Sequence, residues 1–328
     1  MTTMTPMPSL LRRLLVLLPL LALGLATRAV AAPLVLAIGE SPLFAPLQLA
    51  AQEGYFAAEG LDVRVQPCIN GRRCLKHLTD GEAQVATVAD TPMVFALHAG
   101  HRFDIIASFG NSSRDTTMVV RADRGIRTPA DLAGKRIGVV RGTSAHYFAN
   151  VFLLVNGVSR DKVSLVFLDA NRGAEPLLRG EVDAAALYRP VGPQAAQQLG
   201  ANAQVLVTPR PYTVIVNLVA QPGLSQDTLL RLLKAVQRSI TLLNSQPAQA
   251  NARLAALWKL DAKAATALLE GYEFRLSLDQ TLLSTLEAES RWAVREGLTD
   301  NPVVPDYLEL MRTEPLRALD PRAMTLVK

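Results

Sequence analysis

Between residues 33 and 109 the chain alternates short apolar runs with helical patterns, and this alternation limits the fold more than any other feature. The apolar runs are rich in β-branched residues and predict buried strands, at 33–39, 61–66, 84–88 and 105–109. Helical patterns that end at glycine lie between successive runs. Strands that alternate with helices over short loops predict a parallel, doubly wound α/β sheet. In such sheets, ligands bind outside the carboxyl ends of the strands.

The second part of the chain repeats this alternation and then becomes almost entirely helical. Residues 117–121 predict a crossing strand, and strand–helix units follow it, at 135–157, 164–180 and 183–199. Residues 212–220 predict a return strand. Four helices are expected after that strand, at 225–244, 247–258, 262–270 and 279–296. These patterns alone indicate two α/β units.

The segment 134–148 carries the clearest candidate binding motif of the chain. A β-branched strand ends before Gly142, and Thr143 and Ser144 then open a helix that stops at Gly157. Such a turn leaves backbone N–H groups unpaired and points the positive end of the helix dipole outward. These groups suit a small anion or a strongly polar group. An ordinary capped helix is the alternative.

Several motifs around this segment occur in an order that resembles a known family. Three precede or overlap it, PLQLAAQEGYFAAEGLDVRV (46–65), GEAQVATVADTPMVFALHAG (81–100) and TPADLAGKRIGV (128–139). Two follow it, LLRGEVDAAALYRP (177–190) and QQLG (197–200). Over roughly residues 33–260, the chain resembles the periplasmic solute-binding proteins for nitrate, sulfonates, bicarbonate and thiamine precursors (the taurine-like family), which serve ABC importers.

The resemblance implies the type II periplasmic binding-protein fold, which is an α/β fold with two lobes, each a doubly wound sheet with flanking helices. It also implies that the first lobe is discontinuous in the sequence. We therefore expect lobe 1 to comprise residues 32–117 and 218–328, and lobe 2 to comprise residues 118–217. The chain would cross between the lobes near 117–120 and again near 213–218.

Residues 1–31 have the composition of a signal peptide. Arg12 and Arg13 precede an apolar run of 13 residues, which is too short for a comfortable membrane span, and Ala29-Val30-Ala31 is a small-x-small cleavage site. We expect cleavage after Ala31 and a periplasmic location, and an uncleaved anchor helix is the alternative. The remaining chain has 31 basic and 29 acidic side chains and few aromatics, so nucleic-acid binding is not expected.

Cys68 and Cys74 are the two cysteines of the chain and lie six positions apart. An exported protein meets an oxidising compartment, so we expect a disulfide between them. Two separate buried thiols are the alternative. A metal site is not expected, because His77 is the only histidine at ligand spacing from the pair.

Loops at the predicted carboxyl ends of the strands supply the candidate ligand-binding residues. Most of them are polar residues or glycines at the start of a helix or in a turn, so a plain helix cap or a surface turn is the alternative. The candidates are Ser41, Asn70, Thr91, Asn111, Gly142, Thr143, Ser144, His146, Tyr188 and Arg189. The resemblance favours Thr91, because family members place a small polar residue at that turn. Many members also have an aromatic–acid–proline triplet where this chain has Tyr188-Arg189-Pro190, and the replacement of the acid favours an anionic ligand.

These features predict a receptor rather than an enzyme. The resemblance implies that a small polar or anionic solute, such as a sulfonate or nitrate, is captured between the lobes and delivered to an ABC permease and ATPase complex in the inner membrane. We expect a monomer without a cofactor or a metal. A periplasmic enzyme or pathway protein on the same fold, or a receptor that presents its ligand to a membrane sensor, is the alternative. The chain has no G-x-S-x-G motif, and Ser144-x-His146 is not a catalytic triad, so catalysis is disfavoured.

Overall fold

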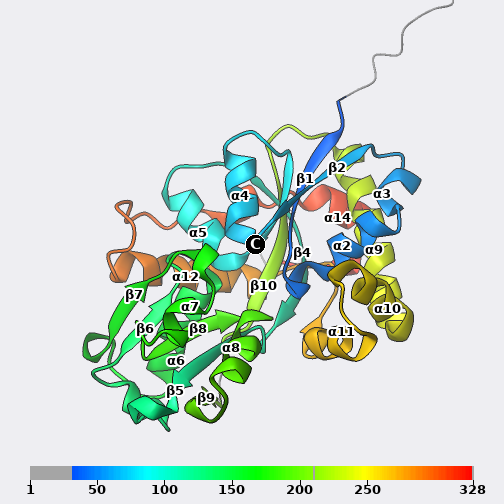
Figure 1. Cartoon of the computed structure of the whole chain (residues 1–328). Coiled ribbons are helices and arrows are strands. Elements are labelled where there is room, and N and C mark those ends of the chain that lie inside the picture. Colours follow the sequence, from blue (N-terminus) through cyan, green and yellow to red (C-terminus); the bar gives the residue numbers. More distant parts are fainter. Residues whose placement is uncertain (1–31, 210, 327–328) are drawn as a thin grey trace, which may run out of the picture. The chain divides into compact units, whose positions relative to one another are not determined.

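The computed structural model describes residues 32–209 and 211–326 (Figure 1). The predicted signal peptide, residues 1–31, lies outside the described residues. Within the described ranges, the strands form a six-stranded, a five-stranded and a two-stranded sheet. No helix in this part of the chain is long and apolar enough to cross a membrane.

The six-stranded sheet has the strand order β11-β4-β10-β3-β1-β2. Its strands are β1 (Leu34–Gly39), β2 (Val63–Cys68), β3 (Val85–Ala89), β4 (Asp104–Ser112), β10 (Val214–Ala220) and β11 (Tyr272–Glu273). β1 pairs in parallel with β2 and β3, whereas β10 runs antiparallel between β3 and β4 (Figure 1). The sequence predicts a parallel sheet, but the sheet is mixed because the return strand β10 enters it from the opposite end.

The five-stranded sheet has the strand order β7-β6-β8-β5-β9 and is also mixed. Its strands are β5 (Thr116–Arg121), β6 (Arg136–Val139), β7 (Ser164–Phe167), β8 (Ala184–Tyr188) and β9 (Ala203–Leu206). β6 pairs in parallel with β7 and β8. β5 is antiparallel to both β8 and β9, so the strand that enters this sheet also reverses its direction.

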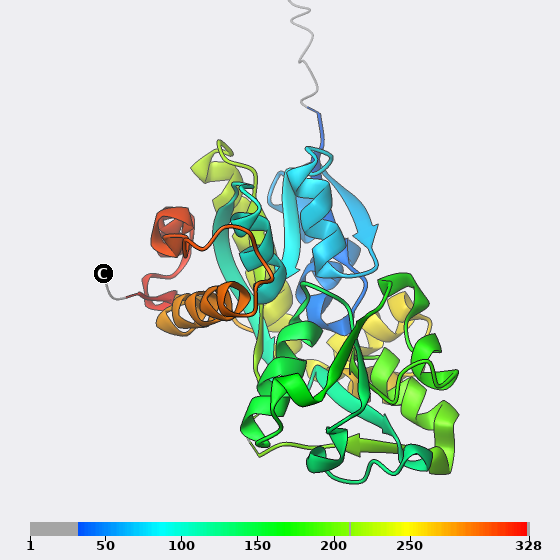
Figure 2. The ribbon, with the colours of Figure 1, turned by 90° about the vertical axis from the view of Figure 1, so that its left-hand side faces the viewer.

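Helices cover both faces of the five-stranded sheet (Figure 2). Helix α6 (Ser144–Val155) packs on the face that Met118 of β5 occupies. Helix α8 (Val191–Leu199) packs on the other face, which Val119 occupies. Successive side chains of a strand point to opposite faces. Because helices cover both faces, Met118 and Val119 are both buried.

The chain passes between the two large sheets twice. It leaves the six-stranded sheet after β4 and enters the five-stranded sheet at β5, so residues 113–115 form the first crossing. It returns between the end of β9 and the start of β10. The sequence places the crossings slightly later, near 117–120 and 213–218, but β5 and β10 each belong to a single sheet.

Helices from both ends of the chain pack around the six-stranded sheet. The N-terminal part supplies α2 (Ala45–Gln52), α3 (Tyr55–Ala58), α4 (Gly71–Thr79) and α5 (Asp90–His98). The C-terminal part supplies α9 (Gln226–Ser245), α10 (Pro247–Trp258), α11 (Ala262–Leu269), α12 (Gln280–Arg295), α13 (Tyr307–Leu310) and α14 (Thr313–Leu319). α9 packs against α2 and α3, and α12 packs against α5.

A short helix and a small sheet lie beside these larger elements. Helix α7 (Glu175–Leu178) packs against α8, and the two-stranded sheet joins β12 (Leu278–Asp279) to β13 (Met324–Thr325). One hydrophobic core includes Leu36 of β1, Leu232 of α9 and Leu286 of α12, all with no exposed surface. The C-terminal helices therefore share their core with the N-terminal strands.

Candidate functional site

A small cavity of about 40 Å³ lies where loops from both large sheets meet. Its lining comprises Ser41, Leu43, Phe44, Asn70, Gly71, Arg72, Ala89, Pro92, Asp115, Thr143, Ser144 and Tyr188. We call it the cleft cavity. Five of the ten ligand-binding candidates line it, and they come from four separate loops or strand ends. They are Ser41, Asn70, Thr143, Ser144 and Tyr188.

Helices begin at the wall of the cleft cavity, and two of their starts are capped by side chains. The Leu43 N–H donates to the Ser41 hydroxyl at 3.3 Å. The Arg73 N–H donates to Oδ1 of Asn70 at 2.9 Å, so the amide of Asn70 caps α4. The same side chain carries an NH₂ group, which is a hydrogen-bond donor, and Asn70 is one of the lining residues.

The start of α6 is different, because it has no side-chain cap. Thr143 occupies the N-cap position, but its hydroxyl donates to the carbonyl of Val140 at 2.7 Å. The backbone carbonyl of Thr143 accepts from the N–H of His146 at 2.9 Å, but its side chain accepts from none of the first N–H groups of α6. Ser144, the first residue of the helix, lines the cavity beside them. This arrangement presents backbone donors and the positive end of the dipole to the cavity.

Two glycines let these helix starts come close to their neighbours. A Cβ at Gly71 would lie 3.0 Å from the Cα of Val88 and 3.2 Å from the backbone nitrogen of Ala89, so only glycine lets α4 approach β3 so closely. Gly142 has a φ of +69°, the left-handed region that favours glycine. A Cβ at Gly142 would lie 3.5 Å from the ring of Phe95.

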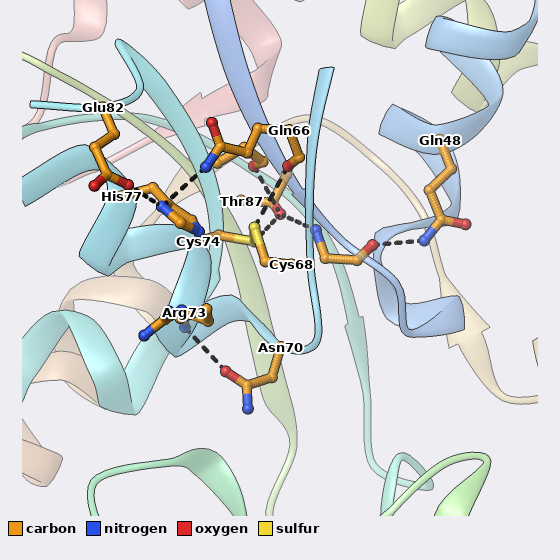
Figure 3. Close-up of a disulfide and its surroundings, with 11 residues drawn as sticks. Gln48, Gln66, Cys68, Asn70, Arg73, Cys74, His77, Glu82 and Thr87 are labelled. Carbon is orange, nitrogen blue, oxygen red and sulfur yellow. Dashed lines mark hydrogen bonds and ion pairs between the residues drawn. A yellow bond between two sulfur atoms is a disulfide. The ribbon is translucent and has the colours of Figure 1, made fainter. Parts of the chain in front are cut away.

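The predicted disulfide between Cys68 and Cys74 is confirmed, with a Cα–Cα distance of 5.5 Å (Figure 3). Cys68 ends β2 and Cys74 lies in the first turns of α4. Figure 3 shows Asn70 in the loop between them, with its carboxamide oxygen directed at the backbone of Arg73. The disulfide therefore fixes the start of α4, which forms one wall of the cleft cavity.

Thr91 lies at the start of α5 but makes its hydrogen bond away from the cleft cavity. Its hydroxyl donates to Oε1 of Glu289 on α12 at 3.0 Å. The neighbouring Asp90 accepts from the N–H of Thr91 and from the N–H of Ile215, each at 2.9 Å, and from the hydroxyl of Tyr212. Asp90, Thr91 and Glu289 have no exposed surface. We call Asp90, Thr91, Tyr212 and Glu289 the carboxyl cluster.

The two acids of the carboxyl cluster repel each other. Burial raises the pKa of Asp90 to about 6, against the hydrogen bonds that it accepts from Tyr212, Ile215 and Thr91. Burial, reinforced by the charge of Asp90, raises the pKa of Glu289 well above its usual range. Because Asp90 accepts more hydrogen bonds, we assign the proton of this pair to Glu289.

His146 packs among aromatic rings instead of lining the cleft cavity. Its ring lies edge-on to Trp292 of α12 and to Phe167 of β7, with centroid distances of 4.9 and 5.4 Å. Only 2% of its surface is exposed. Burial, with smaller contributions from Arg160 and Arg141, lowers the pKa of His146 to about 4, so the imidazole is neutral.

Asn111 and Arg189 also lie away from the cleft cavity. Asn111 lines a larger cavity of about 710 Å³, whose lining also includes Tyr212 and Thr281. The guanidinium of Arg189 donates to the carbonyl of Glu270 at 2.7 Å. Gly142 belongs to the turn before α6 but does not line the cavity itself. The larger cavity contains one of the ten candidates, so the cleft cavity is the better candidate site.

Three polar or aromatic residues of the cleft cavity are not among the residues predicted from the sequence: Phe44, Arg72 and Asp115. Asp115 ends the first crossing, and 2% of it is exposed. Its Oδ1 accepts from the hydroxyl of Tyr272 at 2.6 Å, and burial raises its pKa to about 6. Arg72 donates to the carbonyl of Arg141 at 2.7 Å, so it links α4 to the turn before α6. Asp115 could have been predicted as a site residue, because it is an acid that follows shortly after a buried strand.

The mixed sheets and their two crossings define the class, which is the two-lobed periplasmic binding-protein fold. The alkanesulfonate-binding protein SsuA from Xanthomonas axonopodis pv. citri has a similar structure, with a TM-score of 0.71 and 20% identity over 85% of this chain and 98% of that one. The Candida albicans CA3427 gene product, described as having the generic periplasmic binding protein fold, has a TM-score of 0.66 and 19% identity over 90% and 98%.

A family model described as NMT1/THI5 like matches residues 41–250. The chain belongs to this family. A binding protein of Brucella abortus (strain 2308) is 28% identical over 145 residues, which are 44% of this chain and 43% of the relative. The taurine-binding periplasmic protein of Escherichia coli (strain K12) is 26% identical over 146 residues, 44% and 45% of the two chains. The match thus spans less than half the length of each relative.

Proposed function

We propose that this protein is the solute-binding component of an ABC import system and that it captures a small sulfonate or related anion in the cleft cavity. One observation carries the proposal. The uncapped start of α6, the start of α4 and the side chains of Ser41 and Tyr188 converge on a single cavity between the two large sheets. Helix N-termini and hydroxyls donate hydrogen bonds to anionic oxygens, and burial strengthens each of these bonds. The names of the taurine-binding and alkanesulfonate-binding relatives support the same ligand class.

Closure of two lobes would trap the ligand. The boundaries expected from the sequence, residues 32–117 and 218–328 for lobe 1 and residues 118–217 for lobe 2, would divide β5 and β10. We therefore propose that the chain changes lobes between β4 and β5 and between β9 and β10, so that each lobe is built around one of the large sheets. The cleft cavity encloses about 40 Å³ and takes its lining from both sheets, so a solute would enter while the sheets are further apart. The segments between β4 and β5 and between β9 and β10 would act as the hinge.

Delivery to a transporter requires export of the protein. We propose that residues 1–31 are removed after Ala31, that the mature protein is a periplasmic monomer, and that a permease and ATPase complex in the inner membrane accepts its ligand. Deleting the gene should lower uptake of radiolabelled sulfonate by intact cells. Unchanged uptake, together with tight binding by the purified protein, would favour a receptor for a membrane sensor.

A ligand screen on the mature protein, residues 32–328, tests the binding function. Thermal unfolding is measured with taurine, ethanesulfonate, isethionate, nitrate, bicarbonate and a thiamine pyrimidine, and every hit is titrated by calorimetry. A ligand at 100 times its dissociation constant stabilises the fold by about 2.7 kcal/mol. A sulfonate should give such a shift. Stabilisation by the pyrimidine alone would exclude the sulfonate class.

A further inference from the structure

Asp115 places a carboxylate inside a cavity whose other polar groups suit an anion. It lies at the end of the first crossing, and its backbone carbonyl accepts from the N–H of Arg189 at 3.0 Å. The side chain is buried, and it lines the cleft cavity together with Ser144 and Tyr188. The cavity thus contains helix N-termini and a carboxylate within the same small volume.

The neighbours of Asp115 stabilise this carboxylate only in part. Tyr272 donates one hydrogen bond at 2.6 Å, and the hydroxyl of Thr116 makes a longer contact at 3.4 Å. Arg189 attracts the carboxylate electrostatically, but its guanidinium donates to the carbonyls of Leu268 and Glu270. Among the described residues, Asp115 takes part in no salt bridge, as judged by nitrogen–oxygen distances up to 4.0 Å.

A buried carboxylate without a paired cation destabilises the arrangement that buries it. A plain anion bound in the cleft cavity would add a second negative charge next to Asp115. A solute with an ammonium group would instead supply the missing cation, while its anionic end accepts from the starts of α4 and α6. Phe44 and Tyr188 also line the cavity, and aromatic faces attract ammonium groups.

We propose that Asp115 selects for a cationic group on the solute, so that the preferred ligand is a small zwitterion with an ammonium group beside a sulfonate. This inference rests on the proposed function, and it deepens that function by naming the ligand class. The acid that meets the ligand then comes from the first crossing.

Three sulfonates of nearly equal size test the proposal: taurine, with an ammonium group; isethionate, with a hydroxyl in its place; and ethanesulfonate, with neither. Calorimetric titration of the mature protein should show that taurine binds at least about tenfold more tightly than isethionate, since about 1.4 kcal/mol corresponds to tenfold. Asp115→Asn should bring the ratio of the two affinities close to one. Asp104→Asn, an acid paired with Arg312 outside the cavity, should leave the ratio unchanged.

The possible binding results distinguish the role of Asp115 from the proposed ligand class. Equal affinity of wild-type protein for taurine and isethionate would overturn the inference and leave a sulfonate-binding function intact. Binding of nitrate or a pyrimidine but of none of the three sulfonates would overturn the proposed ligand class, and the inference with it. If Asp115→Asn does not fold, the wild-type ratio still decides, and Tyr272→Phe should weaken the preference because it changes how the carboxylate is held.

Discussion

Two strand-to-helix turns of this molecule have similar sequences and different environments. In one, β3 leads through Asp90 and Thr91 into α5; in the other, β6 leads through Gly142, Thr143 and Ser144 into α6. Both place a small hydroxyl residue where a helix begins, and the sequence predicts a ligand-binding role for both. Only the second turn lines the cleft cavity with its hydroxyl residues.

The difference arises from one acid. Asp90 is the first residue of α5, and its carboxylate accepts the N–H of Thr91 and the N–H of Ile215. The N–H of Thr91 at that helix start is therefore satisfied inside the protein, and so is the N–H of Ile215 on the neighbouring strand β10. No acid stands at the start of α6, where the hydroxyl of Thr143 turns back to Val140. A helix start is available to a ligand when no internal group has already satisfied its donors.

Removal of the acid from the first turn should have the largest effect on stability. Asp90→Ala leaves the N–H of Ile215 and the hydroxyl of Tyr212 buried without their acceptor. Buried groups left unpaired cost about 1–3 kcal/mol each, so the free energy of unfolding should fall by about 3–5 kcal/mol. Urea unfolding measures this. Asp80→Ala, which removes an exposed acid, is the control and should change stability by less than about 0.5 kcal/mol.

The disulfide next to the cleft cavity should have a smaller effect. Replacing both Cys68 and Cys74 with alanine opens a loop of a few residues, for which chain entropy predicts a loss of about 2 kcal/mol. Urea unfolding of the double variant and of reduced wild-type protein should agree. A loss under about 0.5 kcal/mol in both would mean that the loop is already ordered without the bond.

The carboxyl cluster also predicts how stability depends on pH. An acid whose pKa is raised in the folded state stabilises the fold below its unfolded pKa, and this contribution is lost as pH rises through the folded pKa. For Glu289 the ordinary value is 4.5 and the folded pKa lies well above it. Glu289→Gln removes the titration, so wild type should lose stability relative to this variant between pH 5 and pH 8. Glu287→Gln, an exposed acid on the same helix, should track wild type, and a wild type that gains stability over this range relative to Glu289→Gln would contradict the assignment.

The sequence predicts the bounds of the helices better than it predicts which strands pair with each other. The helix predicted at 225–244 is Gln226–Ser245, and the helix predicted at 279–296 is Gln280–Arg295. Local periodicity and capping residues determine such bounds. β4 extends to Ser112, past the predicted 105–109, because β10 and β11 pair with it, and the sequence does not display such pairing.

For the candidate site too, the local sequence predicts positions at strand ends but not contacts with distant segments. Strand ends with polar residues predict Ser41, Asn70 and Tyr188, because the carboxyl ends of strands gather at one edge of a sheet. Thr91 and His146 meet Glu289 and Trp292, which lie on a helix far along the chain, so their local sequence holds no sign of these contacts. Asp115 is not among the predicted residues either, because its burial depends on Tyr272, which lies far along the chain.

The central claim is that the α6 turn binds ligand and the α5 turn supports the fold. The direct test is a calorimetric titration of Ser144→Ala and Thr91→Ala with taurine, combined with urea unfolding of the same samples. Ser144→Ala should bind about tenfold more weakly with stability unchanged, which is about 1.4 kcal/mol, within the range for a hydrogen bond to a charged group. Thr91→Ala should keep its affinity within about twofold and lose about 1–2 kcal/mol of stability, because Glu289 loses a buried donor. Full affinity in Ser144→Ala, or an equal loss of affinity in Thr91→Ala, would contradict the account.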